Sequence, residues 1–374
     1  MKEIRLSGIR KAYGRETVVH DMDLVVRPGE FLTILGPSGC GKTTTLRAIA
    51  GLEEPDDGEI RFDDQVVFSR QKGVIVPPEK RNLGLIFQSY ALWPHMTVEK
   101  NILQPLQNKG LSRAEIDERT TRALDSVQMS AFRKRYPSEL SGGQQQRVAV
   151  ARMIASQPPI LLMDEPLSNL DAKLRLEMRA ELLRLHRELG STTVYVTHDQ
   201  AEALTLSDTV VVMDQGSIVQ IGAPYDIYHH PTNLLVAEFI GEPRINLIEG
   251  ELTEAGGTVV LQGKGIRIPA DAAAGSASRR LVASVRPESI LLSTEKRDGW
   301  QEVRLDNAQP TGSTTILQVA AGDSRLSLVQ TGFVRLEPGI ALWIDFDPAS
   351  VNFFDPATGK NIRTSSKVAG ADVG

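Results

Sequence analysis

The feature that most constrains the fold of this chain is a glycine-rich loop at residues 36–43, with the sequence Gly-Pro-Ser-Gly-Cys-Gly-Lys-Thr. The apolar run 30–35 before it predicts a buried strand, and the pattern over 43–50 predicts a helix. Glycines let the backbone bend so that successive N–H groups point at one anion, at the positive end of the following helix. The loop therefore predicts an α/β domain that binds a nucleoside triphosphate.

The end of the loop carries the charged and hydroxyl groups that such a site needs. Lys42 would bring a positive charge to the β- and γ-phosphates, and the Thr43 hydroxyl could coordinate Mg²⁺. Cys40 occupies a variable position of the loop, and we interpret it as a tolerated small residue. The candidate phosphate-binding residues are Gly36, Pro37, Ser38, Gly39, Cys40, Gly41, Lys42, Thr43 and Thr44.

The length and texture of the chain predict two domains, because 374 residues exceed what one ordinary hydrophobic core holds. Over residues 1–235, strand-like runs alternate with helical patterns, such as the capped helix expected after Ser112 and the apolar stripe over 174–189. This alternation predicts a largely parallel sheet covered on both faces. Over residues 236–374, short strands separated by Gly, Pro, Asp and Ser clusters predict a small all-β barrel-like domain.

Composition narrows the possible partners and the compartment. The formal net charge is −5 and no basic stripe stands out, which gives no support for a nucleic-acid surface. The longest apolar runs are too short to cross a bilayer. The single cysteine, Cys40, excludes an intrachain disulfide and is typical of a reducing compartment. The expectation is a soluble, cytoplasmic protein.

An acidic pair, Asp164 and Glu165, follows the predicted strand 160–163. A carboxylate at the end of a buried strand is costly without a partner, so we interpret Asp164 as a cation ligand. The alternative is a solvated acidic pair that ends a strand, since perturbed carboxylates mark functional sites only probabilistically.

A second loop-to-helix junction lies at Ser141-Gly142-Gly143-Gln144, about a hundred residues after the first. Ser141 makes a good helix N-cap, and the two glycines permit close approach of another backbone. The alternative is an ordinary capped helix, which leaves the glutamine run and Arg147 that follow unexplained.

Together and in this order, residues 36–43, 140–147 and 162–165 resemble the ATP-binding-cassette (ABC) ATPases. The resemblance implies a P-loop NTPase cassette over 1–235, with a RecA-like core and a helical subdomain at about 90–155. It implies ATP and Mg²⁺ as cofactors, with Mg²⁺ held by Thr43, Gln88 and Asp164.

The residues implied to act in catalysis are Glu165 as the base, His198 and Lys42 at the γ-phosphate, and Gln88 at the attacking water. Tyr13 lies where the family stacks an aromatic ring on adenine.

The same resemblance implies that the active site is shared between two copies of the chain. In this family the segment 141–144 of one subunit closes over ATP bound to the other, and the loop 168–171 crosses the dimer seam. The residues implied to act in trans are Ser141, Gly142, Gly143, Gln144 and Asp171. A homodimer with two competent sites is therefore expected.

Residues 239–243 and 285–288 resemble the C-terminal oligonucleotide-binding-like (TOBE) lobe of bacterial importer ATPases of the maltose, multiple-sugar and glycerol-phosphate type. This implies two integral-membrane permease subunits as partners, a solute-binding protein acting indirectly, and a peripheral location on the cytoplasmic face of the inner membrane. Trp93 and the long stretch 71–78 are also familiar from ferric-iron, polyamine and phosphonate importers, so that alternative stays open. A soluble cassette ATPase that acts on DNA or in translation, and a non-enzymatic regulator, are further alternatives.

Overall fold

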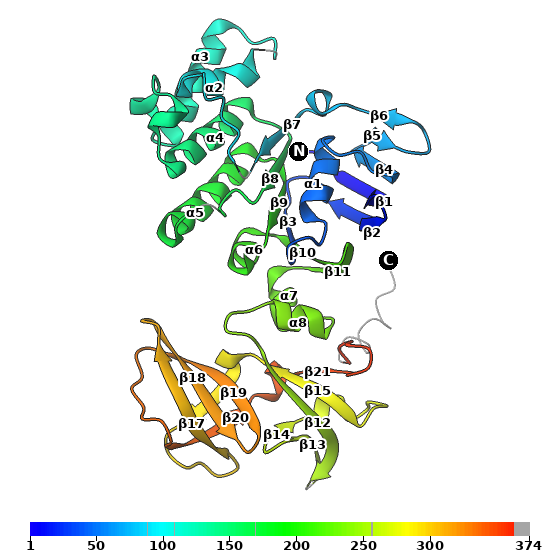
Figure 1. Ribbon diagram of the computed structural model, residues 1–374, viewed down its shortest axis with the longest axis vertical. Coiled ribbons are helices and arrows are strands. Elements are labelled where there is room, and N and C mark those ends of the chain that lie inside the picture. Colours follow the sequence, from blue (N-terminus) through cyan, green and yellow to red (C-terminus); the bar gives the residue numbers. More distant parts are fainter. Residues whose placement is uncertain (88, 108, 169, 256, 363–374) are drawn as a thin grey trace. The chain divides into compact units, whose positions relative to one another are not determined.

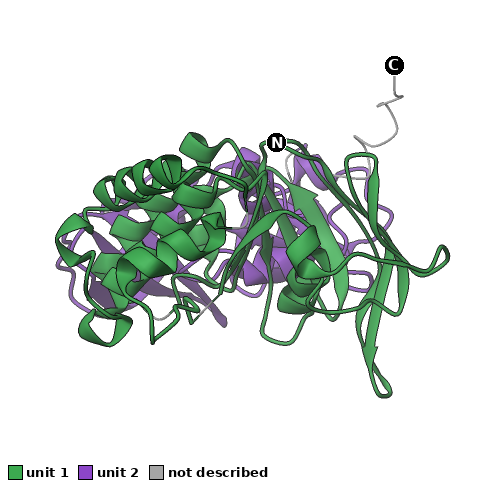
Figure 2. Cartoon of the chain, turned by 90° about the horizontal axis from the view of Figure 1, so that it is seen from above, with its two compact units in different colours: residues 1–224 green, residues 225–374 purple. Residues whose placement is uncertain are grey.

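The computed structural model describes residues 1–362 apart from 88, 108, 169 and 256. The chain divides into two compact units, Met1–Pro224 and Tyr225–Gly374 (Figure 2). The domain limits expected from the sequence, 1–235 and 236–374, stay a prediction.

The first unit is built on a six-stranded sheet (Figure 1). Its strands, in spatial order, are β11 (Ser217–Gly222), β10 (Thr209–Asp214), β3 (Phe31–Leu35), β9 (Thr192–Thr197), β8 (Ile160–Asp164) and β7 (Leu83–Ile86). Neighbours from β10 to β7 pair in parallel, and only β11 is antiparallel. Because the carboxyl ends of parallel strands lie at one edge, the loop after β3, Asp164 at the end of β8 and His198 after β9 come together there.

Side chains that alternate along each strand enter two separate cores. On β9, Val194 and Val196 pack with α1 (Lys42–Ala50), whereas Tyr195 packs with α4 (Gly142–Ser156) and α5 (Ala172–Leu189). The predicted parallel sheet with both faces covered is confirmed. The predicted stripe of α5 is confirmed as well, with its central residues buried and Leu174 and Leu189 partly buried at its ends.

A second, antiparallel sheet in the first unit was not distinguished by the sequence analysis. Its strands are β2 (Glu16–Val26), β1 (Ile4–Tyr13), β4 (Asp57–Phe62), β5 (Gln65–Ser69) and β6 (Val74–Ile75). Ile4 and Leu6 of β1 and Ile60 of β4 are buried in the same core as α1. This antiparallel sheet therefore packs against the same core as α1, the helix that follows the glycine-rich loop.

A helical subdomain is formed by α2 (Val98–Leu103), α3 (Arg113–Ser126) and α4, which pack on one another. The capping box predicted at the start of α3 is present. Glu115 N–H donates to Ser112 Oγ over 3.3 Å, and Ser112 N–H donates to Glu115 Oε2 over 2.8 Å. Among the described residues, the other α-helices of this unit are α1, α5 and α6 (Gln200–Leu206).

The second unit begins with two short helices, α7 (Pro224–His229) and α8 (Leu234–Phe239), and continues as two five-stranded antiparallel sheets. The first contains, in spatial order, β14 (Arg267–Pro269), β13 (Thr258–Gly263), β12 (Asn246–Ala255), β15 (Arg280–Val285) and β21 (Asn352–Phe354). The second contains β16 (Ile290–Ser293), β20 (Ala341–Phe346), β17 (Gln301–Pro310), β18 (Thr314–Ala321) and β19 (Ser324–Thr331). Their inner faces share one hydrophobic core, as expected for the predicted strand-rich domain.

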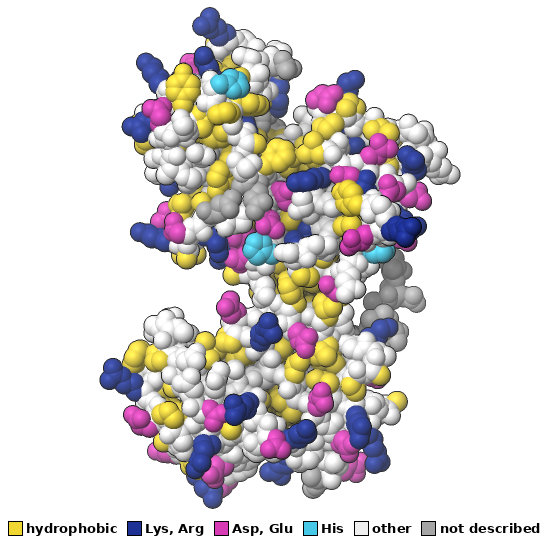
Figure 3. Space-filling view, viewed as in Figure 1, with side chains coloured by type: hydrophobic (Ala, Val, Ile, Leu, Met, Phe, Trp, Pro, Cys, Tyr) yellow, Lys and Arg dark blue, Asp and Glu magenta, His cyan; other side chains and the backbone are white. Residues whose placement is uncertain are grey.

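The surface carries both signs of charge. On the face seen in Figure 3, Lys and Arg side chains are interspersed with Asp and Glu, in line with the absence of a basic stripe in the sequence. Within the described residues, no helix combines the length and the apolar character needed to cross a membrane.

Candidate functional site

The loop 36–43 forms a tight cradle between β3 and α1. Gly41 is the N-cap of α1 with φ of +98°, and a Cβ there would lie 2.5 Å from the Val18 carbonyl oxygen. A Cβ on Gly36 would lie 2.2 Å from the carbonyl oxygen of Met213. Only glycine fits these two positions, because one needs a left-handed backbone and both lie directly against other strands. The loop is thus packed closely between β2 and β10.

Lys42 is buried and its Nζ donates to the carbonyl oxygens of Gly36 and Pro37, over 2.8 and 2.9 Å. The ammonium therefore lies inside the loop that it was predicted to serve. Cys40 Sγ lies 3.9 Å from the same Nζ, and burial raises the pKa of the Cys40 thiol. A neutral thiol packed against the loop agrees with its interpretation as a tolerated small residue.

The predicted metal ligands Thr43 and Asp164 meet directly. Thr43 Oγ1 donates to Asp164 Oδ1 over 2.9 Å, although the two residues come from different elements. Burial raises the pKa of the Asp164 carboxyl, and the Thr43 hydrogen bond opposes that rise. A buried carboxylate beside a hydroxyl offers the hard oxygen donors that Mg²⁺ prefers. No group of three or more His, Cys, Asp or Glu side chains suited to a metal occurs among the described residues.

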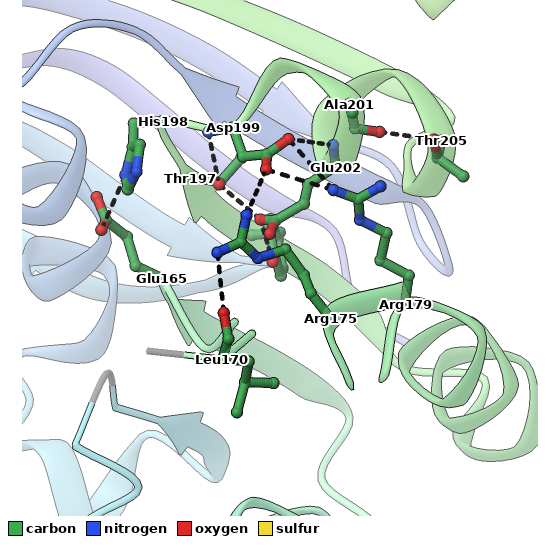
Figure 4. A network of polar contacts seen from close by, with 11 residues as sticks. Glu165, Leu170, Arg175, Arg179, Thr197, His198, Asp199, Ala201, Glu202 and Thr205 are labelled. Carbon is green, nitrogen blue, oxygen red and sulfur yellow. Dashed lines mark hydrogen bonds and ion pairs between the residues drawn. The ribbon is translucent and has the colours of Figure 1, made fainter. Parts of the chain in front are cut away.

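Glu165 and His198 face each other across the ends of β8 and β9 (Figure 4). Glu165 Oε2 lies 3.1 Å from His198 Nδ1, and 55% of the His198 side chain is exposed. Glu165 has φ of +43°, an uncommon conformation for a residue with a side chain, and its N–H donates to Val196 O over 2.9 Å. The strand-end hydrogen bond holds this backbone, so the carboxylate points out of the sheet toward the exposed imidazole.

The segment 141–144 begins α4 as predicted. Gln144 N–H donates to Ser141 Oγ over 3.4 Å, and Ser141 N–H donates to Gln144 Oε1 over 3.0 Å, which completes a capping box. Ser141 and Gly142 are exposed, whereas Gly143 is buried. A Cβ on Gly143 would lie 2.6 Å from Leu174 Cδ2 of α5. The first turn of α4 thus packs closely on α5 and presents its N-terminal tip to solvent.

Asp171 is the N-cap of α5, and its Oδ1 accepts from Leu174 N–H over 3.0 Å. Since Gly143 packs on Leu174, the two helix starts predicted to act in trans lie side by side. Asn169 of the loop 168–171 and the predicted ligand Gln88 lie outside the described residues.

Tyr13 lies at the end of β1, in the hairpin with β2. Half of its surface is exposed, at 50%, and Lys11 Nζ lies 5.2 Å from the centre of its ring. Strand β2 is the one that touches Gly41 through Val18. An exposed ring on the hairpin that supports the loop is compatible with the predicted stacking on adenine, which stays a prediction.

The structure also shows polar contacts that the sequence analysis missed. Arg152 of α4 is buried and donates to the carbonyl oxygens of Tyr90 and Ala91, over 3.1 and 3.0 Å. It thereby ties α4 to the segment after residue 88. Asp199, next to His198, contacts Arg175 and Arg179 of α5 (Figure 4). The only sequence signal was an aspartate after the histidine and two arginines spaced i, i+4 on a helix.

Comparison with known proteins assigns the family. A family model described as ABC transporter matches residues 19–168, and a TOBE domain model matches residues 283–354. The trehalose/maltose import ATP-binding protein MalK of Thermococcus litoralis is 42% identical over 371 residues, covering 97% of this chain and 100% of that protein. The sn-glycerol-3-phosphate import ATP-binding protein UgpC 1 of Rhizobium johnstonii is 41% identical over 363 residues, covering 97% of each chain.

A solved structure supports the fold of the cassette. The dimeric post-hydrolysis state of an ATP-binding cassette bound to ADP and phosphate is similar with a TM-score of 0.52 and 31% identity, over 59% of this chain and 98% of that one. The cassette fold with strands and P-loop arranged as above, and the TOBE lobe after it, confirm the predicted fold class.

The chain belongs to the ABC transporter family, as an ATP-binding subunit of the importer type. It is an ATP-binding enzyme whose hydrolysis of ATP is coupled to transport, as the resemblance implied.

Proposed function

We propose that this chain is the energy-coupling ATPase of a bacterial importer for a carbohydrate or a related organic solute. The supporting relatives import trehalose, maltose or glycerol 3-phosphate, and their similarity extends over both units of this chain. A ferric-iron, polyamine or phosphonate importer is the alternative that Trp93 and the stretch 71–78 left open. Transport assays with the permease subunits that co-purify with this chain would separate these solute classes.

The observation that carries the proposed chemistry is the meeting of Lys42, Thr43, Asp164, Glu165 and His198 at one sheet edge. Lys42 and the loop amides would bind the phosphates of ATP. Thr43 and Asp164 would hold Mg²⁺, with Gln88 as a further ligand, and the ion would neutralise charge on the β- and γ-phosphates. Glu165 would accept a proton from the water that attacks the γ-phosphorus as the bond to the ADP oxygen breaks.

His198 would hold the γ-phosphate from the side opposite Lys42. In the structure its Nδ1 is engaged with Glu165, and more than half of the imidazole is open to solvent. A histidine that is exposed on one side and hydrogen-bonded on the other can contact a phosphate without breaking the bond that orients it. We propose Tyr13 as the ring that stacks on adenine.

We propose that the functional unit is a homodimer attached to two permease subunits at the cytoplasmic face of the inner membrane. The tip of α4, with Ser141 and Gly142, is exposed at the start of the helix, where a partner copy could reach it. It would complete the γ-phosphate shell of the partner copy, together with Gly143, Gln144 and Asp171. Closure would then gate hydrolysis, and release of the closed state would move the permeases.

Replacement of the proposed base tests this assignment. Glu165→Gln keeps the shape of the side chain but removes the proton acceptor, so ATP hydrolysis should fall by about a hundredfold or more while ATP binding persists. Phosphate release and nucleotide binding measure the two properties. Glu177→Gln, at an exposed glutamate of α5, is the matched control and should leave both unchanged. Full turnover in Glu165→Gln would remove Glu165 from the proposed role.

A further inference from the structure

Asp199 lies directly after His198 and makes contacts in three directions (Figure 4). It is the N-cap of α6, where its Oδ1 accepts from Glu202 N–H over 3.0 Å. Its own N–H donates to Thr197 Oγ1 over 3.0 Å. Because the backbone of Asp199 is fixed on both sides, the position of the neighbouring His198 is tied to that of the Asp199 carboxylate.

Arg175 joins this carboxylate to the loop 168–171. Its Nη1 donates to Asp199 Oδ2 over 3.4 Å, and its Nη2 donates to the carbonyl oxygen of Leu170 over 3.0 Å. Its N–H donates to the carbonyl oxygen of Asp171 over 2.9 Å. A guanidinium holds two acceptors in a fixed geometry, so a shift of the Leu170 carbonyl would be passed to Asp199.

A second chain of contacts runs from Ser168 through Glu165 to His198. Ser168 Oγ donates to the carbonyl oxygen of Glu165 over 3.0 Å, and the Glu165 carboxylate reaches His198 Nδ1. In Figure 4, Glu165 contacts His198, and Arg175 joins the carbonyl oxygen of Leu170 to the carboxylate of Asp199. The side chains of Arg175 and Asp199 are each less than a third exposed, so the ion pair is only partly screened by solvent.

Arg179 provides an internal comparison. Its Nη2 reaches the two Asp199 oxygens over 3.4 and 3.3 Å, one helical turn after Arg175. Within the part of the chain that the structure describes, none of its hydrogen bonds goes to the loop 168–171. The Nε groups of both arginines are buried without an acceptor among the same residues, which leaves the network with unused donors.

We propose that Arg175 and Asp199 are positioning residues that couple the loop 168–171 to His198. In the proposed dimer, the partner copy would contact this loop, and Arg175 would carry its displacement to Asp199 and so to the imidazole. The inference rests on the proposed function, because it assigns a route by which the second subunit places a group at the γ-phosphate. Arg175 and Asp199 themselves do not touch ATP in this scheme.

The test compares two arginines that share one carboxylate. Arg175→Ala should lower kcat for ATP hydrolysis about tenfold and leave KM for ATP within about twofold, because it misplaces a group needed in the transition state. Arg179→Ala removes a charge partner of Asp199 but no contact with the loop, and should change kcat by about twofold or less. Equal losses in the two variants, or a change confined to KM, would overturn the proposal.

A second variant keeps the helix cap intact. Asparagine caps helices as well as aspartate does, so Asp199→Asn should preserve α6 while weakening the ion pair, and should lower kcat as Arg175→Ala does. Combining the two should cost little more than either alone, since both break one link. Additive losses, or full kcat in Asp199→Asn, would contradict the coupling.

Thermal unfolding of each variant separates misplacement from loss of the fold. If Arg175→Ala unfolds, Asp199→Asn decides the question alone. Glu165→Gln serves as the reference. An active Glu165→Gln would reject the proposed function, whereas an inactive Glu165→Gln beside a fully active Arg175→Ala would reject only this inference.

Discussion

At the scale of single residues, the site depends on side chains and backbone angles held in costly states. Glu165 keeps a positive φ, Asp164 is buried at the end of β8, and Lys42 is buried at the start of α1. Glu202, in the protein interior beside the site, is another buried carboxyl. It is 2% exposed, and its Oε2 accepts from the hydroxyls of Tyr195 and Thr197 over 2.7 and 2.6 Å. Burial raises the pKa of Glu202 above its usual 4.5, and the two hydrogen bonds oppose the rise.

This shift predicts a pH dependence of stability. A carboxyl with a raised pKa binds its proton more tightly in the folded than in the unfolded protein, so its contribution to stability falls as pH rises. The fall should begin near 4.5 and end at the raised pKa of the folded state. Compared with Glu202→Gln, the wild-type melting temperature should therefore decline across this window and run parallel above it. Curves that are parallel throughout would contradict the assignment.

At the scale of elements, one arginine supports the helix that follows the phosphate loop. Arg81 is 4% exposed, and its Nη1 donates to the carbonyl oxygens of Ala48 and Ile49 at the end of α1, over 2.8 and 2.9 Å. Its Nε donates to Val76 O over 2.8 Å. Burial lowers the pKa of Arg81 to about 10, so it stays charged at neutral pH. The positive charge lies where the helix dipole is negative.

Removal of this charge should destabilise the fold more than removal of a surface arginine. Arg81→Met keeps much of the volume but removes the guanidinium donors to the carbonyl oxygens of Ile49 and Val76, at a cost of about 3 kcal/mol in the free energy of unfolding. Arg70→Ala removes an ion pair with Glu54 from a side chain that is 59% exposed, and should cost less than about 0.5 kcal/mol. Urea denaturation of both variants measures the difference. Similar losses would show that the α1 contacts of Arg81 contribute little.

At the scale of the whole molecule, the proposed active site is divided between two copies of the chain. Lys42→Ala damages the phosphate loop, and Ser141→Arg damages the exposed tip of α4, so neither variant alone should form an ATP-dependent dimer. A mixed dimer has one site with both lesions and one intact site, because the intact loop and the intact tip come from different copies. The mixture should therefore regain ATP-dependent dimerisation, measured by light scattering. A mixture that stays monomeric with ATP would count against completion in trans.

The local features of this protein could be predicted from the sequence by itself. The strand–loop–helix at 30–50, the caps at Ser112 and Ser141 and the alternation that builds a parallel sheet all depend on residues close together in the chain. The sequence motifs in these segments also predicted the ABC transporter family, and the comparisons with known proteins confirmed that prediction. The roles of the individual site residues, including Gln88 outside the described part, stay predictions that the experiments above address.

Only the tertiary structure decided which distant groups meet. The pairing of β1 with β2 and β4, the reach of Arg81 to the end of α1, and the link from Leu170 through Arg175 to Asp199 join segments whose order in the chain does not specify their contact. Each of these residues would look like an ordinary strand or surface residue by pattern alone. The physical reason is that a periodic pattern reports the face a side chain occupies, whereas its partner is set by the packing of the sheets and helices around it.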